Sequence, residues 1–286
     1  MKRILSVDRR LNEIAALANN LAYEGKDPHA YINGAPHIKH GALRHLYGQL
    51  VIEVFDASRR FAPTPKVLDL GAGEGSVTLP FLELGARVVA VDISSRQLDV
   101  LKSKCARFGD LLETRCEDIE ETLSREGEKY DIIAANSFLH HVPDYLTLID
   151  QSTQALTPSG QFFSFQDPLR YDSIGRLTRL FSDAAYVSWR VSKGRNGDLI
   201  GGFKRRLRRR RGIYLPDSRH DNAEYHMTRN GVDQDAIREY FESSGFNCRI
   251  IRYFATQSRV FQPVGAALGV KNTFAVIAQR KSTGDV

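Results

Sequence analysis

The chain has 286 residues, and 42% of them are hydrophobic, so it can bury a sizeable core and is neither disordered nor fibrous in composition. Its apolar runs are shorter than the ~20 residues that a membrane-spanning helix needs. The stretch Ile4–Val7 is also shorter than the roughly 7–15 residues of a signal-peptide core, so we expect a cytoplasmic protein. Cys105, Cys116 and Cys248 form no CxxC pair, which predicts small buried hydrophobes rather than disulfides or zinc ligands.

The formal net charge of +6 is concentrated in one segment. Lys204–Arg211 holds seven basic residues, and without them the net charge becomes −1. The segment lacks the interleaved aromatic residues of single-strand nucleic-acid binders. A nucleic-acid partner is therefore disfavoured, and three roles stay open: a solvated edge, recognition of an anionic acceptor, or contact with an anionic membrane surface.

The first 62 residues are expected to be mostly helical. Apolar residues recur at helical spacing between Leu11 and Ala22, and a second helix is predicted over residues 42–58. Between them lies a loop rich in Gly, Pro and His, residues 24–41. In this loop His37 and His40 are compatible with ordinary surface contacts.

From Lys66 onward, predicted strands and helices alternate. Strands are expected over residues 67–70, 87–91, 111–115, 130–135 and 161–166, with helices over 76–84, 95–108 and 143–156. A helix over 233–243 and strands over 247–253 and 273–279 close the chain. This order predicts an α/β fold, a Rossmann-like seven-stranded mostly parallel sheet with helices on both faces.

Residues 168–230 interrupt the alternation with a long, irregular stretch that contains Tyr186, Trp189 and Tyr225. Long insertions in compact domains are usually functional lids or disordered segments. We therefore expect four parts: an N-terminal helical lid (1–62), a ligand-binding core (63–167), an inserted substrate cap (168–230) and the completion of the core sheet (231–286).

The most informative motif is VLDLGAGEGS at Val67–Ser76, which leaves a strand and opens a helix. Gly71, Gly73 and Gly75 allow a tight turn and a close approach to a ligand. Asp92 ends the next strand, where a carboxylate can accept hydrogen bonds from both hydroxyls of a ribose. In the dinucleotide fingerprint the third glycine follows the second by three residues, but here it follows by two.

This spacing, with Asp69 two residues before the first glycine, resembles motif I of class I methyltransferases that use S-adenosylmethionine (SAM). The resemblance implies SAM as the cofactor. It also implies further cofactor-binding positions: Asp92 at the ribose, Asp118 at the adenine, and Asn136 beside the methionine moiety. Ile93 and Ile119, which follow the two acids, and Tyr31, as an N-terminal lid residue, complete the predicted set. The segment His140-His141-Val142-Pro143 resembles that of small-molecule methyltransferases of the ubiquinone/menaquinone-biosynthesis type.

Structural alternatives stand beside these roles. The glycines could serve the turn alone, Asp92 or Asp118 could cap the following helix, and His140 or His141 could satisfy helix-end groups. If the nucleophile is a hydroxyl, however, a general base assists, and histidine is suited to neutral pH. We therefore predict His140 and His141 as catalytic residues and expect no metal site.

The acceptor is predicted to be a small molecule, most simply a metabolite or natural product methylated on oxygen, with nitrogen or carbon as other acceptor atoms. Asn136-Ser137-Phe138-Leu139 lacks the N-P-P-Y or D-P-P-Y pattern of enzymes that methylate amino groups of adenine or glutamine. Two alternatives are an RNA methyltransferase that uses Lys204–Arg211 and a non-catalytic methyltransferase-like partner subunit.

Overall fold

The computed structural model describes residues 14–18, 35–192, 201, 207–208, 213–215 and 218–281. Within these residues seven strands form one sheet in the order β3-β2-β1-β4-β5-β7-β6. The strands are β1 (Lys66–Leu70), β2 (Arg87–Asp92), β3 (Leu112–Cys116), β4 (Tyr130–Asn136), β5 (Leu156–Pro168), β6 (Phe246–Tyr253) and β7 (Thr273–Arg280). Strands β1 to β5 pair in parallel, and β7 runs antiparallel to both β5 and β6. The predicted seven-stranded, mostly parallel sheet is confirmed.

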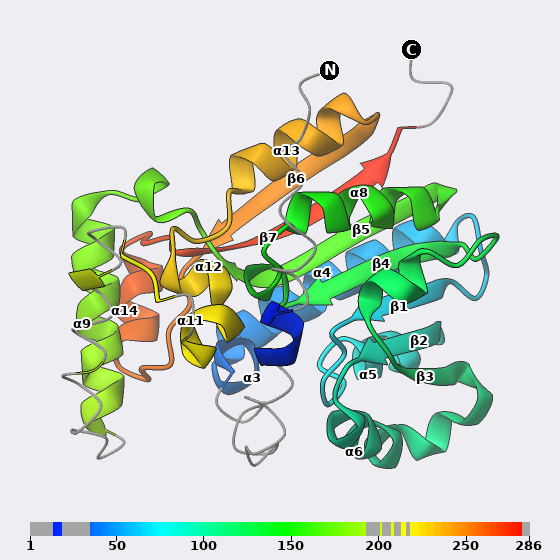
Figure 1. Cartoon of the computed structure of the whole chain (residues 1–286), viewed down its shortest axis with the longest axis horizontal. Coiled ribbons are helices and arrows are strands. Elements are labelled where there is room, and N and C mark those ends of the chain that lie inside the picture. The colour runs from blue at the N-terminus through cyan, green and yellow to red at the C-terminus, as the bar shows by residue number, and fades with distance from the viewer. Residues whose placement is uncertain are drawn as a thin grey trace.

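Helices cover both faces of this sheet (Figure 1). Side chains of α4 (Gly41–Arg59), α5 (Thr78–Glu83) and α6 (Ser95–Cys105) share one buried cluster with half of the strand residues. The second cluster holds side chains of α7 (Ile119–Leu123), α8 (Tyr145–Ala155) and α13 (Gln234–Ser243). Successive residues of a strand point to opposite faces, so Val67 joins the first cluster and Leu68 the second.

The remaining helices gather toward one end of the sheet (Figure 1). They include α3 (Pro36–Lys39), α9 (Arg176–Ser192), α11 (Arg219–Ala223), α12 (Tyr225–Thr228) and α14 (Phe261–Ala267), with the short 3-10 helices η2 (Leu139–His141) and η3 (Tyr171–Ser173). A further 3-10 helix, η1 (Ala106–Leu111), lies elsewhere and links α6 to β3. The expectation that residues 168–230 are irregular is wrong for α9, which has 17 residues. Its apolar side chains recur every three or four residues, as at Leu177, Leu180 and Phe181, which is a helical pattern.

The cysteines differ in burial. Cys105 is buried in α6, Cys248 is partly buried, and Cys116 is exposed. The expectation of a buried side chain is therefore wrong for Cys116, because β3 is an edge strand whose last residue lies at the surface. In the described part of the chain, no helix is both long enough and apolar enough to cross a membrane.

Candidate active site

A cavity of about 1030 Å³ opens where β1, β2, β4 and β5 end. Gly71, Asp92, Asn136 and Gln166, each within two residues of the end of one of these strands, contribute to its lining. Ligands of parallel α/β sheets bind at this edge, next to the point where the strand order reverses. Residues 15–16 and 35–38 of the N-terminal part and several residues of the inserted segment complete the wall.

The glycine loop after β1 has the backbone conformation that its sequence predicts. Gly71 has φ +68°, and Gly73 has φ +51°, values that favour glycine. A Cβ atom at Gly71 would lie 2.2 Å from Cδ2 of Phe138, so close packing also requires glycine there. A Cβ atom at Gly73 would meet no atom within 4 Å, and Gly73 lines the cavity. The loop therefore leaves its backbone accessible to a ligand at Gly73.

Asp92 connects this loop to the end of β2. Its Oδ2 accepts a hydrogen bond from the Gly73 amide at 2.8 Å, and its Oδ1 accepts one from the Ser94 amide at 2.8 Å. Burial raises the pKa of Asp92, and the two backbone hydrogen bonds oppose that rise. Ser94, not Asp92, caps α6, by accepting from the amide of Gln97. Asp92 thus lines the cavity in a fixed orientation.

Asp69 lies outside the lining of the cavity, beneath the loop. It is buried, and its Oδ2 accepts a hydrogen bond from Oγ1 of Thr78 at 2.6 Å. Burial raises the pKa of Asp69 to about 7. Gly75 is also outside the lining, and a Cβ atom there would lie 2.3 Å from Cδ1 of Leu101. Both residues hold the loop in place from behind.

The other residues predicted to bind the cofactor lie along the cavity, except Tyr31, which is outside the described residues. Ile93, Asp118 and Ile119 line it together. Asp118 also caps α7, because its Oδ1 accepts a hydrogen bond from the amide of Glu120 at 2.9 Å. Asp118 therefore both caps the helix and lines the cavity.

The side-chain amide of Asn136, at the end of β4, is hydrogen-bonded through its nitrogen but not through its oxygen among the described residues. Its Nδ2 donates to Oγ of Ser76 at 2.9 Å and lies 3.2 Å from Nε2 of His37. Its Oδ1 is buried and has no hydrogen-bond partner among the described residues. A buried carbonyl oxygen of this kind is suited to a ligand with N–H donors.

His37 was interpreted from the sequence as a possible surface contact, but it is buried in the wall of the cavity. Burial lowers its pKa to about 4, so the ring is neutral at pH 7. It packs against the rings of Tyr47 and Phe165. His40 is half-buried, and its Nε2 lies 2.8 Å from the carbonyl oxygen of Thr256. The sequence analysis missed His37 because a lone histidine in a loop carries no burial signal.

The two predicted catalytic histidines lie together in η2 and line the cavity. Nδ1 and the backbone amide of His140 both donate to Oδ1 of the fully buried Asp167, at 2.8 and 3.1 Å. Nδ1 of His141 donates to the carbonyl oxygen of Ala223 at 2.5 Å. Burial alone would lower the pKa of His140, but the hydrogen bond and charge of Asp167 and the charge of Glu224 outweigh it and raise that pKa.

Backbone strain occurs at the same edge of the sheet. Ser137, directly after β4, has φ +55°, and Gln166, near the end of β5, has φ +71°. Non-glycine residues with positive φ are costly and cluster at functional sites. Ser137 is held by a 2.7 Å hydrogen bond from its amide to the Phe165 carbonyl, and the Gln166 amide donates to Oη of Tyr253.

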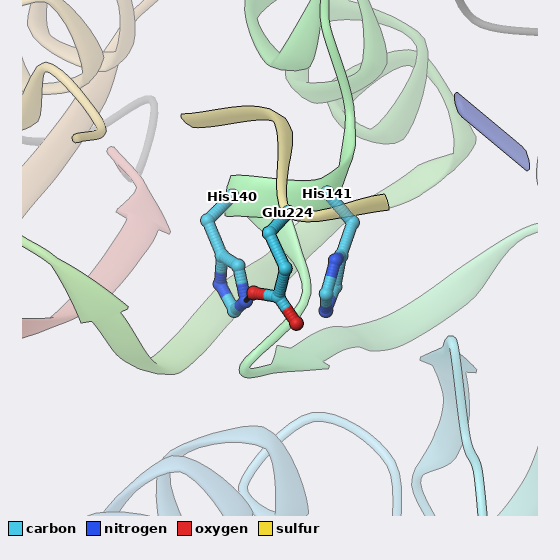
Figure 2. A group of neighbouring side chains, drawn as sticks. All are labelled: His140, His141 and Glu224. Atoms are coloured by element: carbon cyan, nitrogen blue, oxygen red, sulfur yellow. Dashed lines mark ion pairs between the residues drawn. The ribbon is translucent and has the colours of Figure 1, made fainter. Parts of the chain in front are cut away.

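Two acidic residues at this site were missed by the sequence analysis, Asp167 and Glu224. Oε2 of Glu224 lies 3.8 Å from Nε2 of His140, and its carboxylate lies between the two imidazole rings in Figure 2. Asp167 could have been found, since it directly follows the strand that the sequence predicts over residues 161–166. Glu224 had none, because it is 83 residues from His141 and comes from the inserted segment.

The central part of the chain is similar in sequence to known methyltransferases. Residues 68–164 match a family model described as a methyltransferase domain. A ubiquinone biosynthesis O-methyltransferase of Bartonella tribocorum is 37% identical over 98 residues, which is 34% of this chain and 39% of that protein. The protein of the same name from Actinobacillus pleuropneumoniae is 29% identical over 158 residues, 52% of this chain and 64% of that protein. The chain thus matches less than two thirds of the length of these relatives.

Solved structures resemble the fold over nearly the whole chain. Magnesium protoporphyrin IX methyltransferase from Synechocystis PCC 6803, with bound S-adenosylhomocysteine (SAH), has a TM-score of 0.53 at 18% identity and covers 95% of this chain and 100% of its own. A plantazolicin methyltransferase in complex with SAH has a TM-score of 0.54 at 12% identity and covers 95% and 97%. Residues 68–164 thus match a methyltransferase domain, and the chain shares the fold of these solved methyltransferases.

Proposed function

We propose that the chain transfers the methyl group of SAM to a hydroxyl group of a small-molecule acceptor. The observation that supports this most strongly is the continuity of one cavity, which joins Gly73 and Asp92 to His140 and His141. The matched relatives are named as O-methyltransferases, which favours oxygen as the acceptor atom. An intact glycine loop and an oriented Asp92 argue against a partner subunit that has lost its cofactor.

The residues at the ends of β1 to β4 suit SAM chemically. Asp92 would accept hydrogen bonds from the ribose hydroxyls, while Asp118 and Ile119 would contact the adenine. The unpartnered Oδ1 of Asn136 would accept from the ammonium of the methionine moiety. SAM, when bound, supplies a methyl group activated by a sulfonium. The chain holds the acceptor oxygen in line with that group and excludes water.

The acceptor side of the cavity is formed at η2. Asp167 fixes the tautomer and orientation of His140, so that Nε2 is the ring nitrogen available to act on an acceptor hydroxyl. In the simplest mechanism Nε2 takes the hydroxyl proton as the oxygen attacks, and Asp167 stabilises the imidazolium that results. His141 lies beside it, with the ring centroids 4.0 Å apart.

The partner is proposed to be a small molecule rather than a nucleic acid. Arg208, the member of the basic run that the structure describes, lines the cavity and lies 3.6 Å from Oδ2 of Asp221. An inward-facing guanidinium favours an anionic group on the acceptor. One observation also favours contact with an anionic membrane surface: the apolar side chains of Leu177 and Leu180 on α9 are exposed. A cytoplasmic location is part of the same proposal.

The test begins with calorimetric titration of the full chain with SAM, SAH and NAD. We expect SAM and SAH to bind and NAD not to bind. Labelled SAM is then incubated with a panel of phenolic and alcoholic acceptors and with structured RNA, and the products are analysed by mass spectrometry. Absence of SAM binding would refute the proposal. If the chain methylates RNA, and this methylation disappears when Arg208–Arg211 are changed to Gln, the acceptor is RNA and the proposed small-molecule acceptor is wrong.

A further inference from the structure

Three side chains at the acceptor side of the cavity have the composition and proximity of a metal site. His140 and His141 come from η2, and Glu224 comes from the inserted segment, between α11 and α12. One ligand atom from each lies within 4.8 Å of the others. Figure 2 shows the carboxylate of Glu224 between the two rings. Zinc–ligand bonds of about 2.0–2.2 Å would require these atoms to close by on the order of an ångström.

The hydrogen bonds behind the rings determine which nitrogens face this point. Nδ1 of His140 is hydrogen-bonded to a carboxylate oxygen of Asp167, and Nδ1 of His141 is hydrogen-bonded to the carbonyl oxygen of Ala223. Both partners are acceptors, so each Nδ1 carries the proton and each Nε2 of a neutral ring carries the lone pair. Histidines that bind metals almost always donate their other N–H to a carboxylate or a backbone carbonyl in this way.

The burial of the three side chains separates this group from an ordinary acidic surface cluster. His140 is 5% exposed and His141 is 8% exposed, and the side chain of Glu224 is 26% exposed. Two imidazole nitrogens with one carboxylate oxygen suit zinc and other first-row transition ions, whereas magnesium prefers oxygen ligands. Three protein ligands leave a coordination position that a substrate oxygen can occupy.

We infer that His140, His141 and Glu224 bind a divalent transition-metal ion, best matched by Zn²⁺, with one position open to the acceptor hydroxyl. Its catalytic role rests on the proposed function, in which the ion would take the place of Nε2 of His140 as the group that activates the acceptor hydroxyl. An acceptor oxygen in that position loses its proton to water, because the ion lowers the pKa of the hydroxyl. That oxygen then bonds to the methyl carbon as the carbon–sulfur bond breaks and its electron pair stays on sulfur. The products are a methyl ether, SAH and one proton.

This site would also couple the inserted segment to the core. Glu224 belongs to the segment, while both histidines follow β4. An ion shared between them would fix the segment over the acceptor. Metal binding should therefore raise the thermal unfolding temperature of the full chain, as any ligand specific to the folded state does.

The experiment uses the full chain after treatment with a chelator. Zn²⁺ is titrated by calorimetry, and Co²⁺ is titrated by its visible absorption. We expect one equivalent of either ion, and affinity lowered at least ~10-fold by Glu224→Gln and by His141→Gln. Glu83→Gln and His45→Gln, both at exposed positions, should leave it unchanged. Glu224→Asp should retain weaker binding. No stoichiometric site in the unaltered chain, or equal affinity in Glu224→Gln, would overturn the inference.

SAM is titrated into the same metal-free samples, so that two failures can be distinguished. We expect SAM to bind without the ion, because its proposed contacts lie at or after β1, β2, β3 and β4. SAM binding without zinc binding would refute the metal site and leave His140 as the general base. Zinc binding without SAM binding would refute the proposed function alone. Circular dichroism of each variant identifies any that fails to fold, and the Co²⁺ spectrum of the unaltered chain decides independently of the variants.

Discussion

The ring of His37 lies against the amide of Asn136, 99 residues further along the chain, with 3.2 Å between Nε2 and Nδ2. The amide nitrogen donates, so the ring accepts through Nε2. Asn136 ends β4 and also donates to Ser76 in the loop after β1. One buried amide therefore joins α3 to the two strands next to the point where strand order reverses. The N-terminal part of the chain is attached at the cavity itself.

This contact predicts a loss of stability in acid. The folded pKa of His37 is about 4, below the ordinary value of 6.5, because burial disfavours the charged ring. Its contribution to stability is therefore present above pH 6.5 and is lost as the pH falls toward 4, by about 3 kcal/mol in total. The free energy of unfolding of the unaltered chain minus that of His37→Leu should fall between pH 7 and pH 5.

The control for this measurement is His45→Leu, at an exposed position of α4. It should show no comparable change over the same range. A difference between His37→Leu and the unaltered chain that does not vary with pH would show that the ring is not buried in its neutral form.

Asp92 is predicted to contribute directly to SAM binding. Removing its carboxylate in Asp92→Ala deletes charge-assisted hydrogen bonds worth about 1.5–3 kcal/mol, or roughly 10- to 150-fold in affinity. Calorimetric titration with SAM measures this change. Asp99→Ala, on the exposed side of α6, removes the same group away from the cavity and should bind normally. Equal SAM affinity in Asp92→Ala would remove this residue from the cofactor site.

Asp69 should behave differently, although it belongs to the same motif. Its pKa is raised to about 7, so over the range from pH 3.8 to 7 the unfolded chain loses this proton more readily than the folded chain. Stability therefore falls as the pH rises through that window, by about 4 kcal/mol, and then levels. In Asp69→Asn this fall is absent. The free energy of unfolding of the variant, relative to that of the unaltered chain, should therefore rise between pH 4 and pH 8.

The same variant tests the position of Asp69 behind the loop. Because Asp69 does not line the cavity, Asp69→Asn should change SAM affinity much less than Asp92→Ala does. Denaturant titration at several pH values gives the stability difference, and Asp99→Asn serves as the exposed control. A pH-independent difference, together with a large loss of SAM affinity, would instead place the carboxylate at the cofactor.

These residues show what the sequence could and could not predict. The sheet was predictable because short apolar strands such as Val67–Leu70 alternate with helices, and local pattern carries that information. Asp92 and Asn136 were predictable because they follow such strands. Glu224 and His37 were not, since their positions depend on how distant segments fold over the sheet. The helix α9 could have been predicted from its spacing, but its unusual place in the chain favoured a loop.

Gly71 packs closely against the ring of Phe138. A Cβ atom at position 71 would lie 2.2 Å from Cδ2 and 2.6 Å from Cε2 of that ring, in a backbone with φ +68°. Gly71→Ala should therefore cost about 1–2 kcal/mol for the left-handed backbone and a further 1–3 kcal/mol for overpacking. In Phe138→Ala the ring is gone, so only the backbone cost should remain, and the double variant should be more stable than the sum of single effects predicts. Gly85→Ala, at φ +94° with no atom within 4 Å of the new Cβ, should show no such coupling to Phe138. Urea unfolding of the four chains measures the coupling energy, and a Gly71→Ala cost that is the same with and without the ring would refute the close approach.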